Sequence, residues 1–298
     1  MISVLIPTYN YSVIPLVEEL HKQLEASKCI YEIIVWDDGS SETFDLQNRI
    51  INHVPNIHYF RSEEHLGSTK TRQLLYKKSV FNWLLFIDAD VMPKSPEFIK
   101  TYLNLIPKDY DAIFGGYTYG KVAPKDDMVL QWKYGISKEK THGNIANSNS
   151  YKVIVSSNFM IKRSVFTAIN PNIEKLGFGF DNYFGTLLKE NKAKVIHIHN
   201  EVYHLGITSN ERFLEKTKLA ISNLLDLYQN GKINIHDNSL LNTFIRLKTM
   251  GMSGIYRLIY KKLHLKMEGH LCGKNPSLRL FKFYKITYMC FKNRNGQL

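Results

Sequence analysis

Short apolar runs alternate with helical patterns along the first 200 residues of the chain. The runs are mostly β-branched or aromatic, and near-continuous apolar runs of this length are typical of strands covered on both faces. Between them, leucines and valines recur at helical spacing behind Ser12, a candidate N-cap, and Ser68–Lys78 has the pattern of a basic amphipathic helix. This order predicts right-handed βαβ units and an α/β fold with a mixed, mainly parallel sheet and helices on both faces. The predicted strands are Ser3–Ile6, Glu32–Trp36, Ile57–Arg61, Trp83–Ile87 and Ala112–Phe114.

The second half of the chain carries fewer strand patterns. Lys138–Ser150 is polar and rich in Asn and Ser, which predicts a mobile loop. A long helix is expected from Thr208, whose spacing to Glu211 fits a capping box, to a stop at Asn230-Gly231. Three further elements are predicted between these segments: a strand over Val153–Ile161, a helix over Asp181–Glu190 and a strand over Val195–His199.

The C-terminal region differs from the rest of the chain in its charge. The strand–helix alternation ends near residue 206, so we expect an α/β domain over 1–206 and a small, basic, helical region over 207–298. The formal net charge is +12, and residues 241–298 hold twelve Lys/Arg and one acid, Glu268, a balance of +11. The basicity is therefore a property of the tail.

Three interpretations of this basic tail are open: a solvated surface, a nucleic-acid site, or contact with an anionic membrane. No recognised DNA- or RNA-binding motif accompanies the charge, so nucleic acid is not expected as a partner. Aromatic side chains are interleaved with the lysines and arginines, which favours an interfacial helix at a lipid boundary. These aromatic residues are Phe281, Phe283, Tyr284, Tyr288 and Phe291.

Cysteine usage and the first residues bear on the compartment. The three cysteines are far apart and form neither a disulfide framework nor a zinc-site spacing, which suits a reducing compartment. Met1–Pro7 has the pattern of a strand rather than of a signal peptide, and no apolar run approaches the roughly 18 residues of a membrane-spanning helix. We expect a cytoplasmic protein with peripheral contact at the inner face of the plasma membrane.

Polar or acidic clusters follow three of the predicted strands. Pro7–Asn10 follows the first, Asp37–Ser40 the second, and Asp88-Ala89-Asp90 the fourth. Ligands of open parallel α/β sheets lie beyond the carboxyl ends of the strands, so the three clusters are expected along one edge. Two carboxylates two residues apart can bind Mg²⁺ or Mn²⁺ and leave room for phosphate, although a solvated strand end is the alternative. Asp37–Ser40 is either an ordinary turn or a site for a nucleobase or ribose.

Five short segments carry a resemblance to a known family. They are Val4–Asn10, Glu32–Ser41, Phe86–Asp90, Gly177–Asn182 and Val202–Gly206. In this order and spacing they resemble family 2 glycosyltransferases of the GT-A fold, over roughly residues 1–206. The resemblance implies a Rossmann-like domain that transfers a sugar, with inversion, from a nucleotide-diphosphate donor to a glycan or lipid-linked acceptor, and the expected donor is a UDP-sugar. It also implies Mn²⁺ or Mg²⁺ as the cofactor.

The resemblance further implies residue roles. Asp37 would contact the uracil edge, with Asp38 as the second candidate, and Arg72 would pair with phosphate or with Asp37. A solvated helix arginine is the alternative for Arg72. Asp88 would contact ribose and metal, and Asp90 would be the more direct metal ligand. The implied contacts of the nucleotide sugar are Pro7, Thr8, Tyr9, Asp37, Asp38, Gly67, Arg72, Asp88 and Ala89.

Several polar residues later in the chain are weaker candidates. His204 resembles a late histidine of the family that approaches the diphosphate or the metal, and a structural histidine is the alternative. His197 and His199 share a face of a predicted strand, and a structural pair is favoured over zinc because no further ligand spacing supports a metal site. Asn158 could hydrogen-bond the donor sugar, although ordinary strand polarity explains it equally well.

Asp181 is the candidate catalytic base. In an inverting transfer a carboxylate takes the proton of the acceptor hydroxyl. The family usually has Glu-Asp at this point, whereas this chain has Asp181-Asn182, so either Asp181 is the base shifted by one place or the second acid has become an amide. The alternative for Asp181 is a helix N-cap.

Two other function classes stay open. A nucleotidyltransferase of related fold should carry a Gly-rich basic loop after the first strand, and Pro7–Ser12 does not supply one. The dinucleotide and P-loop fingerprints, GxGxxG and GxxxxGK[ST], are also absent. A catalytically decayed, transferase-fold binding protein is the third class, and Asn182 keeps it open.

Overall fold

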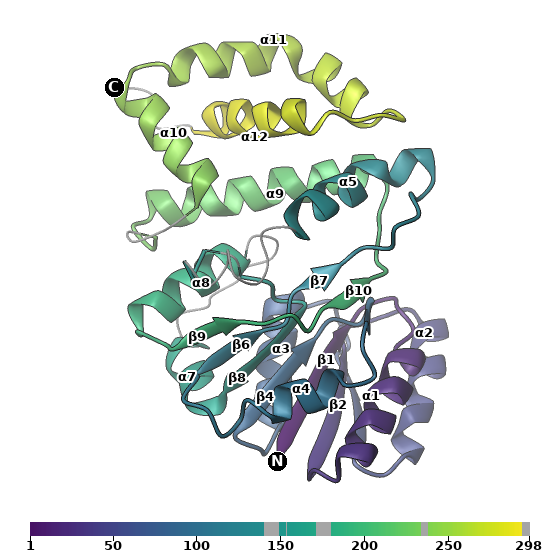
Figure 1. Cartoon of the computed structure of the whole chain (residues 1–298). Coiled ribbons are helices and arrows are strands. Elements are labelled where there is room, and N and C mark those ends of the chain that lie inside the picture. The colour runs from purple at the N-terminus through teal and green to yellow at the C-terminus, as the bar shows by residue number, and fades with distance from the viewer. Residues whose placement is uncertain (140–148, 153, 171–179, 234–237, 294–298) are drawn as a thin grey trace. The chain divides into compact units, whose positions relative to one another are not determined.

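The computed structural model describes residues 1–139, 149–152, 154–170, 180–233 and 238–293, which form two compact units (Figure 1). Unit 1 contains Met1–Thr118, the described part of Thr141–Gly177, and Leu187–Gly206. Unit 2 contains the described parts of Tyr119–Lys140, Phe178–Thr186 and Ile207–Leu298. The domain boundary predicted near residue 206 stays a prediction. Unit 2 also includes two segments that precede this boundary, the described parts of Tyr119–Lys140 and Phe178–Thr186.

Seven strands from the described residues form the main sheet of unit 1, in the order β3-β2-β1-β4-β8-β6-β9. Neighbours among β3, β2, β1 and β4 are parallel, as are β6 and β9, whereas β8 runs antiparallel to both β4 and β6. The prediction of a mixed, mainly parallel sheet is confirmed. The strands are β1 (Ile2–Thr8), β2 (Tyr31–Asp37), β3 (Ile57–Arg61), β4 (Trp83–Ile87), β6 (Ala112–Phe114), β8 (Asn158–Lys162) and β9 (Val195–His197).

Helices cover both faces of this sheet (Figure 1). Successive strand residues point to opposite faces, so Val4, Ile33 and Met160 pack with buried side chains of α1 and α4. On the other face, the ring centroid of Phe86 lies 5.1 Å from that of Phe166 in α7. Burying each such side chain contributes about 1.5–3 kcal/mol. The helices are α1 (Ile14–Ser27), α2 (Glu42–Asn48), η1 (Arg49–His53), α3 (Ser68–Lys78), α4 (Phe98–Leu103) and α7 (Arg163–Ile169).

A small second sheet in unit 1 was not predicted. It has the order β5-β10-β7 and consists of β5 (Val91–Pro93), β10 (Val202–His204) and β7 (Tyr117–Thr118). β10 is antiparallel to β5, with His204 opposite Val91. This pairing puts the chain just after Asp90 beside the chain at His204.

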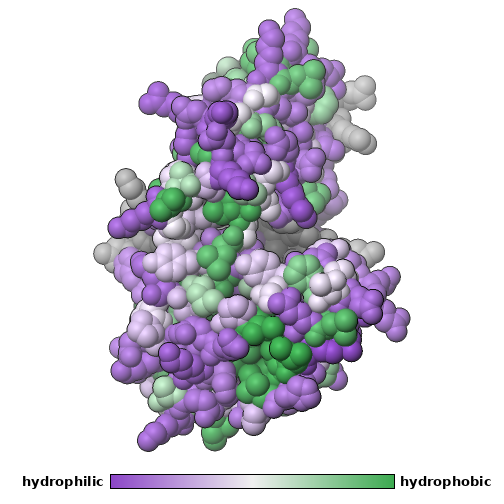
Figure 2. Space-filling model, turned by 90° about the vertical axis from the view of Figure 1, so that its right-hand side faces the viewer, coloured by the Kyte–Doolittle hydropathy of each residue, from purple (hydrophilic) through white to green (hydrophobic). Residues whose placement is uncertain are grey.

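Unit 2 is helical, and Figure 1 shows α12 between α11 on one side and α9 and α5 on the other. The prediction of a helical C-terminal region is confirmed. Figure 2 shows hydrophobic side chains scattered among hydrophilic ones on the surface of these helices. α8 (Phe180–Glu190) begins in unit 2 and ends in unit 1. The other elements of unit 2 are η2 (Asp126–Met128), α5 (Val129–Glu139), α9 (Asn210–Gln229), α10 (Ser239–Thr249), α11 (Ser253–Leu271) and α12 (Leu278–Lys292).

Two predicted helix caps were wrong. α1 begins at Ile14, and its capping residue is Val13 rather than Ser12, with a proline in the first turn and the Val13 N–H bonded to a side-chain oxygen of Asn48. α9 is capped by Ser209, whose hydroxyl accepts the N–H of Arg212. Thr208 and Ser209 are adjacent, and Ser209 has the extended backbone of a cap, whereas Val13 has no side-chain oxygen and α1 begins without a side-chain cap of its own.

The aromatic residues that suggested an interfacial helix mostly face inward. Phe281, Tyr284 and Tyr288 of α12 are buried, and the ring of Phe291 stacks on Tyr260 at 4.8 Å. Only Phe283 among the five is exposed. The predicted lipid contact of this aromatic set is therefore wrong, because these rings form the core of unit 2. Within the described residues, no helix combines the length and apolarity needed to cross a membrane.

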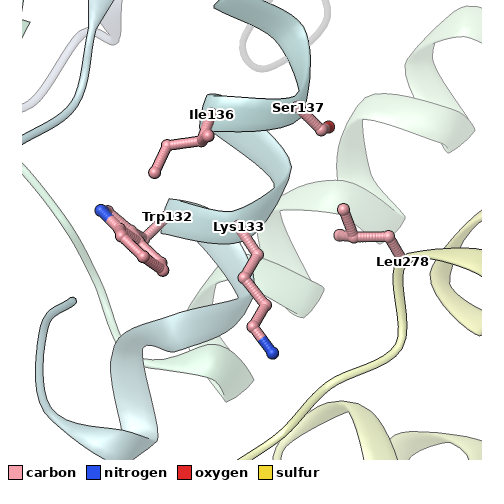
Figure 3. Close-up of a pocket in the computed structure, with 5 residues that line it drawn as sticks. All are labelled: Trp132, Lys133, Ile136, Ser137 and Leu278. Carbon is pink, nitrogen blue, oxygen red and sulfur yellow. The ribbon is translucent and has the colours of Figure 1, made fainter. Parts of the chain in front are cut away.

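A hollow of about 460 Å³ opens in unit 2 between α5 and the start of α12 (Figure 3). It contains none of the predicted site residues. The predicted loop Lys138–Ser150 adjoins it in sequence, and residues 140–148 of that loop lie outside the described residues. The hollow is lined by Trp132, Lys133, Ile136, Ser137 and Leu278.

Candidate active site

The segments that follow β1 and β2 are tied together by hydrogen bonds. The Asp38 N–H donates to the Thr8 carbonyl at 2.9 Å, and the Asn10 N–H donates to the Ser40 hydroxyl at 2.7 Å. The Ser41 N–H donates to the side-chain oxygen of Asn10 at 2.9 Å. Asn10 holds a left-handed backbone, with φ at 49°, which Asn adopts more readily than most residues. The two predicted clusters therefore lie next to each other at the carboxyl edge of the sheet.

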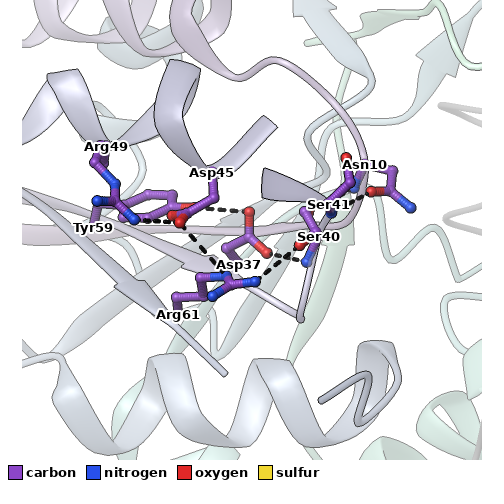
Figure 4. Close-up of polar contacts among 8 residues, drawn as sticks. All are labelled: Asn10, Asp37, Ser40, Ser41, Asp45, Arg49, Tyr59 and Arg61. Atoms are coloured by element: carbon purple, nitrogen blue, oxygen red, sulfur yellow. Dashed lines mark hydrogen bonds and ion pairs between the residues drawn. The ribbon is translucent and has the colours of Figure 1, made fainter. Parts of the chain in front are cut away.

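Asp37 is fully buried at the centre of a polar network (Figure 4). Its carboxylate accepts the Ser40 N–H at 2.7 Å and the Tyr59 hydroxyl at 2.8 Å, and that hydroxyl also lies 3.0 Å from Asp45. Burial, and then the hydrogen bond to Asp37, raises the pKa of Tyr59 far above its ordinary value. Both carboxylate oxygens of Asp37 are thus bonded within the protein and the residue has no exposed surface, so Asp37 holds the loop after β2 in place instead of making the predicted contact with the uracil edge.

Asp45 connects this network to two arginines that sequence reasoning missed. Burial raises the pKa of the Asp45 carboxyl, but hydrogen bonds from Arg49 and Tyr59 and the charge of Arg61 outweigh burial and leave the pKa below its ordinary value. Arg61 also donates to the Ser40 carbonyl at 3.0 Å. The loop that carries Asp37 is thus held by charge-assisted contacts on its outer side.

Asp38 is a cap for the helix that follows β3. Its two carboxylate oxygens accept the N–H groups of Leu66 and Gly67, each at 2.8 Å, and one lies 3.0 Å from Nδ1 of His65. Gly67 immediately precedes α3 and has φ at 89°, a region that glycine adopts without strain. A carboxylate beside the N-terminus of a helix is stabilised by the unpaired N–H groups and the helix dipole.

Tyr9 presents an exposed ring at the same edge. The Tyr9 side chain is 46% exposed, and its ring centroid lies 4.1 Å from that of His65 at an interplanar angle of 35°. An exposed aromatic ring of this kind offers a flat apolar surface on which a nucleobase can stack. His65 was not predicted, although it stands two residues before Gly67, which was.

Arg72 pairs with Asp88, not with Asp37. Its guanidinium donates to Asp88 at 2.5 Å, and the Arg72 side chain is buried while that of Asp88 is partly exposed. The Asp88 N–H donates to the Ser157 carbonyl at 3.1 Å, which links the end of β4 to the start of β8. Arg72 therefore orients the Asp88 carboxylate of Asp88-Ala89-Asp90, which is called the DxD motif below.

Asp90 is fixed from the other side by the segment after β10. The Leu205 N–H donates to the Asp90 carbonyl at 2.8 Å. A Cβ added to Gly206 would lie 1.8 Å from Oδ2 of Asp90, so the carboxylate fills the space that only glycine leaves open. Burial, and then the charge of Asp90, raises the pKa of Tyr11, so the segment after β1 also reaches this aspartate.

His204 lies opposite Val91 in the small sheet, next to the end of the DxD motif, and its ring centroid is 6.1 Å from that of Tyr117. Ala89 is buried between the two aspartates. Among the described residues, no three His, Cys, Asp or Glu side chains are grouped closely enough to hold a metal ion, so His204 is not brought into one ligand set with Asp88 and Asp90. Mg²⁺ and Mn²⁺ take oxygen ligands and usually complete their coordination with phosphate and water, so the two aspartates by themselves fit such an ion.

Asn158 has a structural role instead of the predicted contact with the donor sugar. It is fully buried, and its NH₂ group donates to the carbonyls of Gly116 and Asn200 at 2.8 and 2.9 Å. Its side-chain oxygen accepts the Tyr102 hydroxyl at 2.7 Å. A Cβ at Gly115 would lie 2.5 Å from the same NH₂ group, so this glycine is required by close packing.

The predicted catalytic base lies in unit 2. Asp181 stands in the first turn of α8 and is half-buried. The preceding motif residues 177–179 lie outside the described residues. His197, by contrast, is a buried structural histidine: its Nε2 contacts the Ser150 carbonyl at 2.7 Å, and burial lowers its pKa.

Sequence and fold comparisons agree with this arrangement. Residues 3–169 match the sequence profile of Glycosyl transferase family 2. A stretch of 109 residues, 36% of this chain, is 28% identical to the chondroitin synthase of Escherichia coli, and the chain spans only 16% of that protein's length.

Two solved structures share the fold. The mannosyltransferase PcManGT from Pyrobaculum calidifontis, in complex with GDP-Man and Mn²⁺, matches with a TM-score of 0.56 at 12% identity, over 98% of this chain and 85% of that one. TarS of S. aureus, in complex with UDP-GlcNAc, matches with a TM-score of 0.51 at 19% identity, over 75% of this chain and 66% of that one. Together with the profile match over more than half of the sequence, the GT-A architecture leads to one assignment. The chain belongs to glycosyltransferase family 2.

Proposed function

We propose that this protein transfers a sugar, with inversion, from a nucleotide-diphosphate donor, a UDP-sugar, to a hydroxyl of a glycan or a lipid-linked acceptor. The observation that carries the proposal is the fixation of Asp88-Ala89-Asp90 between Arg72 and Leu205-Gly206, next to the loops after β1 and β2. Residues 1–206 would form the transferase domain, and 207–298 a basic helical region.

The donor would lie along the carboxyl edge of the main sheet. The exposed ring of Tyr9, beside the ring of His65, would support a nucleobase there, and the buried Asp37 would hold the neighbouring loop through its bonds to Ser40 and Tyr59. The structures of PcManGT with GDP-Man and of TarS with UDP-GlcNAc support a nucleotide sugar as the donor class.

Asp88 and Asp90 would hold Mn²⁺ or Mg²⁺. The bound ion would neutralise the charge that develops on the departing diphosphate. Arg72 would keep Asp88 ionised and oriented through their ion pair, because an adjacent cation favours the charged form of a carboxylate.

Asp181 would act as the base. The acceptor oxygen attacks the anomeric carbon, the bond from that carbon to the diphosphate breaks, and the acceptor proton passes to the Asp181 carboxylate. Its position in the first turn of a helix favours the ionised form at the start of the reaction.

The test is turnover of a panel of nucleotide sugars with and without Mn²⁺, in the wild type and in Asp90→Asn and Asp181→Asn. In the wild type we expect release of nucleoside diphosphate that needs the metal, and in Asp90→Asn we expect this metal-dependent release to be lost. In Asp181→Asn we expect turnover to fall about 10²–10⁴-fold while donor binding is retained. Release of pyrophosphate instead would identify a nucleotidyltransferase. Donor binding without any turnover in the wild type would identify a decayed binding protein.

A further inference from the structure

α11 (Ser253–Leu271) has one covered side within unit 2. Tyr260, Met267 and Leu271 are buried. The ring of Tyr260 lies 5.4 Å from that of Tyr288 and 4.8 Å from that of Phe291, both in α12. This side of α11 is therefore already used in the packing of the unit.

The opposite side of α11 carries large aliphatic side chains in the open. Ile255, Leu258 and Leu265 are 55%, 56% and 73% exposed. Spacings of three and seven residues bring them onto one stripe of the helix. At the height of α11, Figure 2 shows hydrophobic side chains interspersed with hydrophilic ones. These three residues are called the α11 stripe below.

Lysines surround the α11 stripe. Lys261, Lys262 and Lys266 are all exposed, and they stand within one or two turns of the three aliphatic residues. The one acid of α11, Glu268, is occupied inside the unit: its carboxylate lies 2.7 Å from the Lys218 ammonium and accepts the Tyr284 hydroxyl at 2.6 Å. The exposed side of the helix therefore carries positive charge that no acid of the same helix offsets.

We propose that the exposed side of α11 is a docking surface for an anionic lipid membrane. Aliphatic side chains would enter the boundary between headgroups and acyl chains, while the lysines contact lipid phosphates. A helix of 19 residues is about 28 Å long, enough to lie along the surface with the whole stripe in contact. The proposed membrane contact is made by α11, whose opposite side packs on aromatic rings of α12.

The charge and the shape of this surface favour lipid over other occupants. A second copy of the chain would bring two sets of three lysines together, and like charges facing each other oppose association. Nucleic acid would use the lysines but leave the three aliphatic side chains in water. An anionic bilayer complements both features at once.

The test is co-sedimentation of the full chain with vesicles of phosphatidylcholine containing one third phosphatidylglycerol, compared with phosphatidylcholine alone. We expect binding to the anionic vesicles that weakens with salt. Two variants address the surface: Leu258→Ser with Leu265→Ser, and Lys261→Gln with Lys262→Gln and Lys266→Gln. Each should lower the partition coefficient about tenfold or more. The lysine variant changes only exposed side chains and should fold, so it tests membrane binding even if the serine variant unfolds.

Matched controls remove the same groups elsewhere. Ile30→Ser with Val80→Ser removes two aliphatic side chains of similar exposure, and Lys108→Gln with Lys121→Gln and Lys125→Gln removes three exposed lysines. Both controls should bind vesicles like the wild type. Absence of vesicle binding, equal losses in variants and controls, or a dimer in sedimentation equilibrium that the serine variant alone abolishes would overturn the proposal. The assay contains neither donor nor acceptor, so its outcome is independent of sugar transfer.

Discussion

Gly206→Ala tests whether the position of Asp90 matters for the proposed reaction. The added Cβ would lie 1.8 Å from Oδ2 of Asp90, whereas ordinary contact begins at 3.4 Å, so the carboxylate must move by about 1.6 Å (3.4 − 1.8). All three atoms nearest to the Cβ belong to the Asp90 side chain, and the φ of Gly206 lies outside the left-handed region. The substitution should therefore displace the Asp90 carboxylate and shift the backbone only slightly, because Cβ of Asp90 would lie 3.0 Å from the new Cβ.

The two consequences differ in size. Moving one aspartate out of its preferred rotamer costs about 0.5–1.5 kcal/mol, which corresponds to a fall in Tm of roughly 1–6 °C. Disturbing the orientation of a metal-binding carboxylate weakens metal affinity about 10–100-fold. We expect Gly206→Ala to fold nearly as well as the wild type but to need about 10–100-fold more Mn²⁺ for half-maximal turnover.

The assay is a Mn²⁺ titration of donor turnover, with a thermal melt of each protein. Gly120→Ala is the matched control, because nothing lies within 4 Å of a Cβ at Gly120. It should keep both the wild-type melting temperature and the wild-type Mn²⁺ requirement. An unchanged Mn²⁺ requirement in Gly206→Ala would refute the reasoning, since Asp90 would then be displaced without consequence.

Three further predictions concern stability. Tyr59→Phe leaves a buried oxygen of Asp37 without its donor and should lower the free energy of unfolding by about 1–3 kcal/mol in urea denaturation, whereas Tyr203→Phe, at an exposed side chain, should stay within about 0.5 kcal/mol of the wild type. Gly39→Ala should cost about 1–3 kcal/mol or more, because φ is +78° and the Cβ would lie 2.8 Å from a backbone carbon; a near-neutral melt would contradict this. Burial, and then a neighbouring lysine, lowers the pKa of Lys285 to about 8, so the cost of burying its charge is complete below that pH and is relieved as pH rises. Lys285→Met should therefore melt above the wild type at pH 7, and the difference should shrink toward pH 10; a constant difference would refute the assignment.

The sequence alone predicted the regular elements of the main sheet. β3, β4 and α3 have the bounds that the apolar runs and the helical pattern indicated. A strand shows a period of two residues and a helix a period of 3.6 residues. Each period can be counted within one segment without knowing what the segment packs against. The place of Asp88-Ala89-Asp90 at the end of a buried strand followed from the same pattern.

Only the tertiary structure decided how these residues are held. That Arg72 pairs with Asp88, and that Gly206 leaves space for the Asp90 carboxylate, depends on segments that are 16 and 116 residues apart in the chain. β7 and β5 were not predicted from their own residues, and they exist because β10 pairs with both.

The same distinction explains the tail. The sequence determined its basicity and its helical character, because charge and period are properties of the residues themselves. It did not determine which aromatic and aliphatic groups face water. The rings of Tyr284 and Tyr288 are buried because α11 and α9 cover them, while Leu258 and Leu265 are left outside. An amphipathic pattern shows that a helix has an apolar side, and only packing decides which of its apolar residues find a partner.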